Sequence, residues 1–304
     1  KTTKFKARFF RNILKSNEIT INKMKQYLGA LRYILENGAD RQSRTGISTR
    51  AVFGMQLRFN MEDGFPAVTT KKLPWKSVAS ELLWFIEGSD DERRLAEILH
   101  GTRDSGKTTI WTANAEADYW KPKAKFQGDL GRIYGVQWRR WKGFDGKETD
   151  QLANAINMIK ENPTSRRIIV TAWNPGELNK MALPPCHAFF QFFVADDKLS
   201  LQMYQRSCDM FLGVPFNIAS YSLLLHMMAQ VTDLKPYEFV HVLADAHIYH
   251  NHFEQVKEQL SRKPFSLPKL WLNQEIKNID DFTMDDIKLE NYNFHPQIKA
   301  EMAV

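Results

Sequence analysis

The spacing of apolar residues along the chain predicts helices joined to short strands. Where apolar side chains recur every three or four positions, they line one face of a helix. Four segments share this pattern: 24–35, 76–86, 150–161 and 253–261. Asn37-Gly38, Gly88 and Asn162-Pro163 end the first three, because such residues stop helices. Residues 217–231 are apolar on almost every side, which predicts a long buried helix.

Short runs rich in β-branched, apolar and aromatic residues predict strands between these helices. Five runs have this composition: 51–53, 56–59, 167–173, 187–195 and 199–205. Asp196-Asp197-Lys198 is a turn, so the last two strands should form a hairpin. The sequence contains no internal repeat and no linker rich in Pro, Gly and Ser. The pattern predicts an α+β fold: a single domain with a mixed β-sheet packed against a long central helix.

Two regions depart from this regular pattern. Residues 1–22 form a basic N-terminal extension, and residues 1–17 hold six Lys or Arg and no acidic residue. A transit peptide has a similar composition, but Ser is sparse and no cleavage signal stands out, so we favour a plain extension. Residues 101–127 are rich in Gly, Lys, Asp and aromatic side chains. We expect residues 88–127 to form a variable small subdomain within a globular domain over 23–304.

Charge and cysteine content narrow the class of protein. The 304 residues include 42 Lys or Arg and 35 Asp or Glu, a net charge of +7 that favours anionic partners. RNA is one such partner, and small phosphorylated molecules are another. Two Cys cannot form a disulfide framework, which indicates a reducing compartment such as the cytoplasm. The most apolar stretch, 221–231, contains His226 and is too short to span a membrane.

Cys186 is the candidate nucleophile. It follows Pro184-Pro185, which stiffen the backbone, and it precedes a predicted strand. A nucleophilic cysteine must be a thiolate, so it needs nearby positive charge or hydrogen-bond donors. The predicted hairpin can bring Arg206 to it, because the turn lies almost midway between the two residues. The alternative is that Cys186 is a small buried apolar residue.

Several arginines could bind a phosphate group. They are Arg44, Arg166, Arg167 and Arg206, the last of which is followed by Ser207. A phosphate monoester needs several donors in a small volume. Arg166 and Arg167 are adjacent, so in a strand they point to opposite faces, and they are either solvated or reach a shared anion at an edge. The absence of a glycine-rich phosphate loop argues against an NTPase or a nicotinamide-dependent enzyme.

Four of the eight histidines lie between His241 and His252. Their spacing does not match a zinc motif, and no paired Cys accompanies them, so we expect no metal site. His247 and Tyr249 would share one strand face and could bind the hydroxyl of a sugar. The alternative is that both are core residues.

Two polar residues lie within predicted apolar helices. If Glu81 is buried, its pKa rises and it can transfer protons near neutral pH; on the solvated side it would do neither. Asn217 begins the long helix, where Asn most often caps the first turn. Its amide could instead point outward and match the O4 and N3–H groups of uracil, which cytosine lacks.

Taken together, these residues resemble thymidylate synthases. The matching motifs occur in order over residues 24–304: Arg44-Thr45-Gly46, 65–72, 81–85, 128–131, Tyr134-Gly135, 137–139, 165–167, 172–174, 182–187, 205–209, 211–221 and Asp245-x-His247-x-Tyr249. The runs around Cys186 and over 204–221 are the most specific. The resemblance implies a thymidylate synthase-like catalytic domain over 23–304 and a homodimer with its sheet faces packed together.

The resemblance also implies a reaction. That reaction is reductive methylation of dUMP to dTMP, with 5,10-methylenetetrahydrofolate as the donor of both carbon and hydride. Cys186 would attack C6 of the uracil, Glu81 would organise water and protons, and Tyr134 would assist removal of the C5 proton. The implied catalytic set is completed by Arg206, Asn217 and Asp209.

Substrate contacts follow from the same resemblance. The implied contacts to dUMP are Arg44, Arg206, Ser207, Asp209, Asn217, His247 and Tyr249, with Arg166 and Arg167 reaching in from the second subunit. The implied contacts to folate are Lys71, Glu81, Trp111, Asp209 and Val304. The C-terminus would close over the site and exclude water.

The sequence departs from the family pattern at a few positions. Thr112 stands where the family commonly has Asp, Arg132 where an apolar residue or Pro is usual, Ala244 where Gly is usual, and Met302 where Val is more common. None of these removes a catalytic group. The nearest alternative function is a dUMP hydroxymethylase, with 5-hydroxymethyl-dUMP and tetrahydrofolate as products. Trp111 and the apolar Ala303-Val304 favour methylation, because they suit a lid that excludes water.

Overall fold

The computed structural model describes residues 24–43, 46–104 and 106–301. The basic N-terminal extension, Arg44 and Val304 carry sequence-based expectations and lie outside the described residues.

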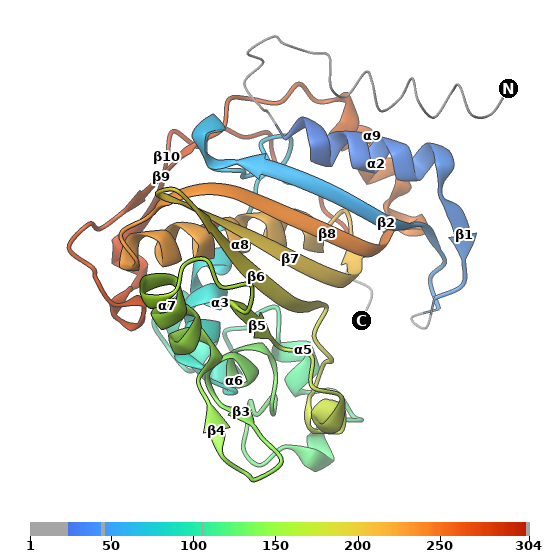
Figure 1. Ribbon diagram of the computed structural model, residues 1–304. Helices are drawn as coiled ribbons and strands as arrows, with labels where there is room; N and C mark the ends of the chain where they lie inside the picture. Colours follow the sequence, from blue (N-terminus) through green and yellow to red (C-terminus); the bar gives the residue numbers. More distant parts are fainter. Residues whose placement is uncertain (1–23, 44–45, 105, 302–304) are drawn as a thin grey trace, which may run out of the picture.

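A six-stranded sheet forms the centre of the described fold (Figure 1). Its strands lie in the order β1 (Ala39–Arg41), β2 (Thr49–Asn60), β8 (Lys235–Tyr249), β7 (Lys198–Asp209), β6 (His187–Ala195) and β5 (Ile169–Thr171). The β7–β8 pair is parallel and the other neighbours are antiparallel. The sheet is therefore mixed, as the sequence predicts.

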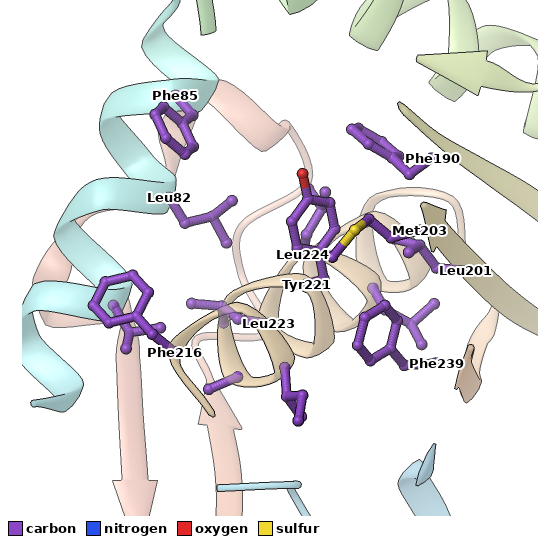
Figure 2. Packing of buried hydrophobic residues seen from close by; sticks show 14 of the residues in the cluster. Leu82, Phe85, Phe190, Leu201, Met203, Phe216, Tyr221, Leu223, Leu224 and Phe239 are labelled. Carbon is purple, nitrogen blue, oxygen red and sulfur yellow. The ribbon is translucent and has the colours of Figure 1, made fainter. Parts of the chain in front are cut away.

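The long apolar helix is α8 (Gly213–Val231), which packs along β7 and β8. Nearly all of its side chains are buried, because α3 (Trp75–Glu87) covers the side turned away from the sheet. Figure 2 shows Tyr221 of α8 between Leu82 and Phe85 of α3 and Met203 and Phe239 of the sheet. This confirms the predicted packing of the mixed sheet against a central helix.

The remaining elements surround this core. The other helices are α2 (Lys25–Asn37), α4 (Glu92–His100), α5 (Thr112–Ala115), α6 (Tyr134–Arg139), α7 (Gln151–Glu161) and α9 (Phe253–Ser261). Two small two-stranded sheets pair β3 (Trp141–Lys142) with β4 (Glu148–Thr149) and β9 (Lys269–Leu272) with β10 (Ile287–Glu290). Helix α2 packs on β2, and α6 packs on α3.

The observed strands differ from the predicted ones in several places. The runs 51–53 and 56–59 form one strand, β2, whose register with β8 is the same on both sides of Gly54. Gly54 has φ +83°, a conformation that glycine adopts without strain, so pairing continues through it. The run 167–173 yields only the three residues of β5. The sequence places His247 and Tyr249 on a strand, but it does not predict the full extent of β8, whose polar residues break the simple alternation. Strands β1, β3, β4, β9 and β10 were not predicted either.

The sheet face turned away from α8 carries exposed apolar side chains. Phe190 of β6 is buried against Tyr221 of α8, so by alternation its neighbour Phe189 points to the opposite face. Phe193 and Ile169 lie on that same face and are 65% and 43% exposed. Clusters of exposed apolar side chains of this kind mark interaction surfaces.

Candidate active site

The β6–β7 hairpin positions Cys186. His187, the first residue of β6, pairs with Gln205 of β7, and the Arg206 N–H donates to the Cys186 carbonyl oxygen at 2.8 Å. The predicted hairpin is confirmed, and it places Cys186 and Arg206 side by side. The Cys186 side chain is half-buried, whereas the second cysteine, Cys208, is fully buried.

Aromatic rings form one wall beside Cys186. The Cys186 N–H donates to the Tyr134 hydroxyl at 2.6 Å. The Tyr134 ring stacks on Phe85 of α3, and its centroid lies 4.4 Å from that of His187. Burial raises the pKa of Tyr134 well above its ordinary value, so this side chain stays a phenol and acts through its hydroxyl.

The protonation state of Cys186 reflects two opposing effects. Burial raises the pKa of its thiol above the ordinary value. The Arg206 guanidinium is the strongest influence in the other direction, followed by the hydroxyls of Tyr134 and Ser207. The sequence correctly predicted a cation next to the thiol, but desolvation outweighs that cation. The thiol therefore keeps its proton at neutral pH until a ligand changes its surroundings.

Glu81 is buried inside α3, which resolves the choice that the sequence left open. It is 7% exposed, and the Trp111 indole N–H donates to its Oε1 at 2.7 Å. Burial raises the pKa of Glu81 to about 7, and the Trp111 hydrogen bond limits the rise. Such a carboxyl group can both give and take a proton near neutral pH.

Arg206 is held firmly by the loop that carries Cys186. Its Nε donates to the Pro185 carbonyl oxygen at 2.8 Å, and an Nη donates to that of Pro184 at 2.9 Å. The guanidinium also lies over the Trp173 ring, 5.2 Å from its centroid. These contacts fix one edge of the fork while the side chain remains half-buried, so the other edge can bind an anion.

Arg166 and Arg167 lie at the edge of the sheet, just before β5, and both are exposed. The ion pairs found among the described residues include neither of them. The sequence left open whether they are solvated or reach an anion. Within one chain both side chains are therefore exposed to solvent.

Asn217 lies five residues into α8 and does not cap it. The helix begins at Gly213 and its N-cap is Leu212, so the capping alternative is wrong. Its Oδ1 accepts a hydrogen bond from Gln205 Nε2 at 3.0 Å, and its Nδ2 lies 3.2 Å from His187 Nε2. Asn217 is 8% exposed, and its contacts with Gln205 and His187 fix the orientation of the amide.

His247 and Tyr249 lie on the same side of β8, as predicted, with ring centroids 5.2 Å apart. His247 Nδ1 lies 3.1 Å from Asp245 Oδ1, and Arg41 donates to the other oxygen of that carboxylate. A carboxylate accepts only, so Nδ1 is the donor to Asp245, and in the neutral tautomer Nε2 has a lone pair that could accept from a hydroxyl.

Asp209 and Lys71 lie behind the start of α8. Asp209 Oδ1 accepts from the backbone N–H groups of Phe211 and Leu212 at 3.0 and 3.2 Å. Lys71 is 7% exposed, donates to the Phe211 carbonyl oxygen and lies over the ring of the same residue. Burial lowers its pKa to about 8. A contact between Lys71 and a folate tail would require this ammonium to leave Phe211.

The unusual residues at 112 and 132 each have a carboxylate partner. The hydroxyls of Thr112 and Thr109 donate to Glu92 Oε1 at 2.7 and 2.6 Å. Arg132 Nε donates to Glu177 Oε2 at 2.5 Å. Both carboxylates are buried, so these pairings satisfy groups that would otherwise be costly. Ala244 is buried in β8, and nothing in the structure explains its departure from Gly.

The Thr112 pairing predicts a large penalty for the residue that is usual at this position. In Thr112→Asp, a second carboxylate would face Glu92, which is 1% exposed. We expect the free energy of unfolding at pH 7 to fall by about 2–4 kcal/mol. Thr112→Val, which loses one hydrogen bond, should cost about 1 kcal/mol. Urea unfolding measures both, and equal losses in the two variants would contradict the charge argument.

Sequence reasoning did not assign roles to His187, Gln205 and Tyr221, which support the site from behind. All three are buried: His187 Nδ1 lies 3.0 Å from the Tyr221 hydroxyl, and Gln205 contacts Asn217. A signal was available for Gln205, because it is a polar residue at a core-facing position of a predicted strand.

In residues 24–43, 46–104 and 106–301, no group of three or more His, Cys, Asp or Glu side chains is arranged to hold a metal ion. In the same ranges, no helix has the length and apolar character needed to cross a membrane.

A known protein family matches residues 25–304 of this chain. The matched family is thymidylate synthase, whose enzymes are methyltransferases that act on dUMP with methylenetetrahydrofolate as co-substrate. The match includes the Cys186–Arg206 hairpin, the buried Glu81 and the Asn217 amide, and it covers nearly the whole sequence. The chain therefore belongs to the thymidylate synthase family.

Proposed function

We propose that this enzyme reductively methylates dUMP to dTMP, with 5,10-methylenetetrahydrofolate giving both the carbon and the hydride. The observation that carries the proposal is that a series of contacts through Tyr134 connects three groups. They are a half-buried thiol beside Arg206, a carboxyl group with its pKa near 7, and an amide fixed from behind. The thiol would act as the nucleophile, the carboxyl group would transfer protons, and the amide would form hydrogen bonds with the edge of the pyrimidine.

Covalent attack by Cys186 begins the reaction. The sulfur forms a bond to C6, and the C5–C6 π electrons move toward C5 and O4. Arg206 favours the thiolate, and Glu81, at its pKa of about 7, can supply a proton toward O4 through water. C5 is then nucleophilic and bonds to the methylene carbon of the folate.

The later steps require a base near C5 and exclusion of water. Loss of the C5 proton expels tetrahydrofolate from the adduct and leaves an exocyclic methylene. Tyr134 stays a phenol, so it would orient a water molecule that accepts this proton. Hydride transfer oxidises tetrahydrofolate to dihydrofolate, and the Cys186–C6 bond then breaks. Trp111 would lie beside the folate, where its N–H also holds Glu81.

The nucleotide would be bound by groups around this thiol. Asn217 would pair with O4 and N3–H of the uracil, and His247 Nε2 with Tyr249 would hold the 3′-hydroxyl. Arg206 and Ser207 would bind the phosphate, together with Arg44, which lies outside the described residues.

The active assembly would be a homodimer in the cytoplasm. The exposed apolar side chains of the sheet face, including Phe189 and Phe193, would pack against the same face of a second copy. Arg166 and Arg167, which are exposed at the edge of the sheet, would complete the phosphate site of the partner subunit.

Product analysis tests the reaction. Incubation with dUMP and methylenetetrahydrofolate should give dTMP and dihydrofolate in equal amounts, with the rise in absorbance that accompanies dihydrofolate formation. A dUMP hydroxymethylase would give 5-hydroxymethyl-dUMP and tetrahydrofolate without that rise. The second result would replace the proposal, and conversion of neither substrate would contradict both alternatives.

Mixed dimers test the shared site. Arg166→Ala and Cys186→Ser should each be nearly inactive alone. In an equal mixture after subunit exchange, half of the dimers would be hybrids, each with one intact site, so about a quarter of wild-type activity should return. An unchanged sum of the two separate activities would show that each chain builds its own site.

A further inference from the structure

We propose that His241 is a specificity-determining positioning residue: through Gln205 it fixes which way the Asn217 amide faces, and so selects uracil over cytosine. This inference rests on the proposed function. His241 is fully buried on β8, between Leu57 of β2 and Met203 of β7, and it cannot touch the nucleotide itself.

Five side chains form one continuous hydrogen-bonded network behind the site. His241 Nε2 lies 2.8 Å from Gln205 Oε1, and Gln205 Nε2 donates to Asn217 Oδ1 at 3.0 Å. Asn217 Nδ2 lies 3.2 Å from His187 Nε2, and His187 Nδ1 lies 3.0 Å from the Tyr221 hydroxyl. Each member is at most 8% exposed, so water cannot replace a lost partner readily.

One backbone carbonyl identifies the direction of this hydrogen-bonded network. Gln205 Nε2 also donates to the Ser207 carbonyl oxygen at 3.0 Å, and a carbonyl can only accept. The nitrogen of Gln205 must therefore face Ser207 and Asn217, and its oxygen must face His241. It follows that Asn217 presents its oxygen to Gln205 and its nitrogen to His187.

The surroundings of His241 enforce the same direction from the other end. Its Nδ1 is buried and has no hydrogen-bond partner among the described residues. A buried donor without a partner costs more than an acceptor in the same place, so the proton belongs on Nε2, facing Gln205. A reversed Gln205 amide would meet this N–H with a second donor. His241 thus excludes the reversed arrangement.

The two histidines of this hydrogen-bonded network, His187 and His241, are neutral near pH 7. Burial lowers the pKa of His187 and of His241 to about 3 in each case. Protonation would make both ring nitrogens donors and would break the ordered sequence of donors and acceptors. The hydrogen-bonded network therefore keeps the same order of donors and acceptors across the pH range in which the enzyme would work.

The orientation matters because uracil and cytosine need the amide oxygen and the amide nitrogen in opposite places. With its orientation fixed, Asn217 has one N–H left for O4 and one lone pair left for N3–H, which is the uracil pattern. A reversed amide would offer the opposite pattern, which matches the amino group and bare N3 of cytosine. Loss of the His241 donor should therefore weaken discrimination more than it weakens binding.

The test compares two amides of different reach at position 241. His241→Gln can place an N–H near Gln205, whereas the shorter side chain of His241→Asn cannot. We expect the ratio of dCMP to dUMP dissociation constants to fall about tenfold in His241→Asn, equivalent to one net hydrogen bond. In His241→Gln the ratio should stay within about twofold of wild type. Calorimetry or competition binding measures both constants, and thermal unfolding reports folding.

A matched control separates positioning from packing. His226→Phe alters another histidine, whose Nδ1 lies 3.1 Å from the Ser222 carbonyl oxygen and whose ring packs against Phe65. It should change stability without changing the ratio, and His241→Phe, should it fold, should behave as His241→Asn. An unchanged ratio in folded His241→Asn, or equal ratios in the Asn and Gln variants, would overturn the inference. A wild-type protein that binds neither nucleotide would instead contradict the proposed function.

Discussion

Replacement of Cys186 by serine is expected to lower turnover of dUMP by at least about 10⁴-fold while leaving dUMP binding within a few-fold of wild type. A serine hydroxyl at this position has a far higher pKa than a thiol, and Arg206 cannot make it a nucleophile. Arg206 and Asn217 hold their positions through contacts that do not involve the thiol, so the binding surface should survive. Steady-state kinetics and calorimetry measure the two quantities separately.

A covalent adduct gives the same prediction a direct readout. 5-Fluoro-dUMP carries fluorine at C5, so the step that removes the C5 proton is blocked and the sulfur–C6 bond should persist with folate attached. Mass spectrometry of digested wild type should find the adduct on the peptide that contains Cys186. Cys208→Ser is the matched control, because Cys208 is fully buried, its pKa is raised strongly by burial, and it should not react. An adduct on any other residue would contradict the mechanism.

Local rules were enough to predict how Cys186 and Arg206 meet. Alternation and a short turn specify an antiparallel hairpin, and the register of a hairpin follows from its turn. The observed pairing of His187 with Gln205 agrees with this reasoning. The sequence left open whether Glu81 is buried. Which side of α3 is buried depends on its packing against α8, which is more than 100 residues away in sequence.

Long-range packing explains what the sequence did not predict. Asn217 was placed at the start of its helix, but the helix begins four residues earlier, with Pro215 in the first turn, where a missing N–H is tolerated. The inward position of Lys71 depends on the Phe211 carbonyl, 140 residues away. The same holds for His241, whose partner Gln205 lies on a parallel strand that no local pattern pairs with β8.

Glu81 should make both stability and activity depend on pH around neutrality. Its pKa is about 7 in the folded protein against an ordinary value of 4.5, so the folded state keeps a proton that the unfolded state loses. Stability should therefore fall as pH rises from about 4.5 to 7 and level off above that. The shift corresponds to about 3 kcal/mol at most. Glu81→Gln has no such proton and should lack this part of the pH dependence.

The kinetic effect follows from the same proton. In free enzyme the protonated carboxyl is the form that can donate toward O4 when sulfur attacks C6, so kcat/KM for dUMP should decline above a pKa near 7. Glu81→Gln should lower kcat by about 10²–10⁴-fold and remove that limb of the profile. Trp111→Phe offers a graded comparison, because it deletes the N–H that stabilises the carboxylate and should move the limb to higher pH. A limb that persists unchanged in Glu81→Gln would assign the titration to another group and remove Glu81 from the proton path.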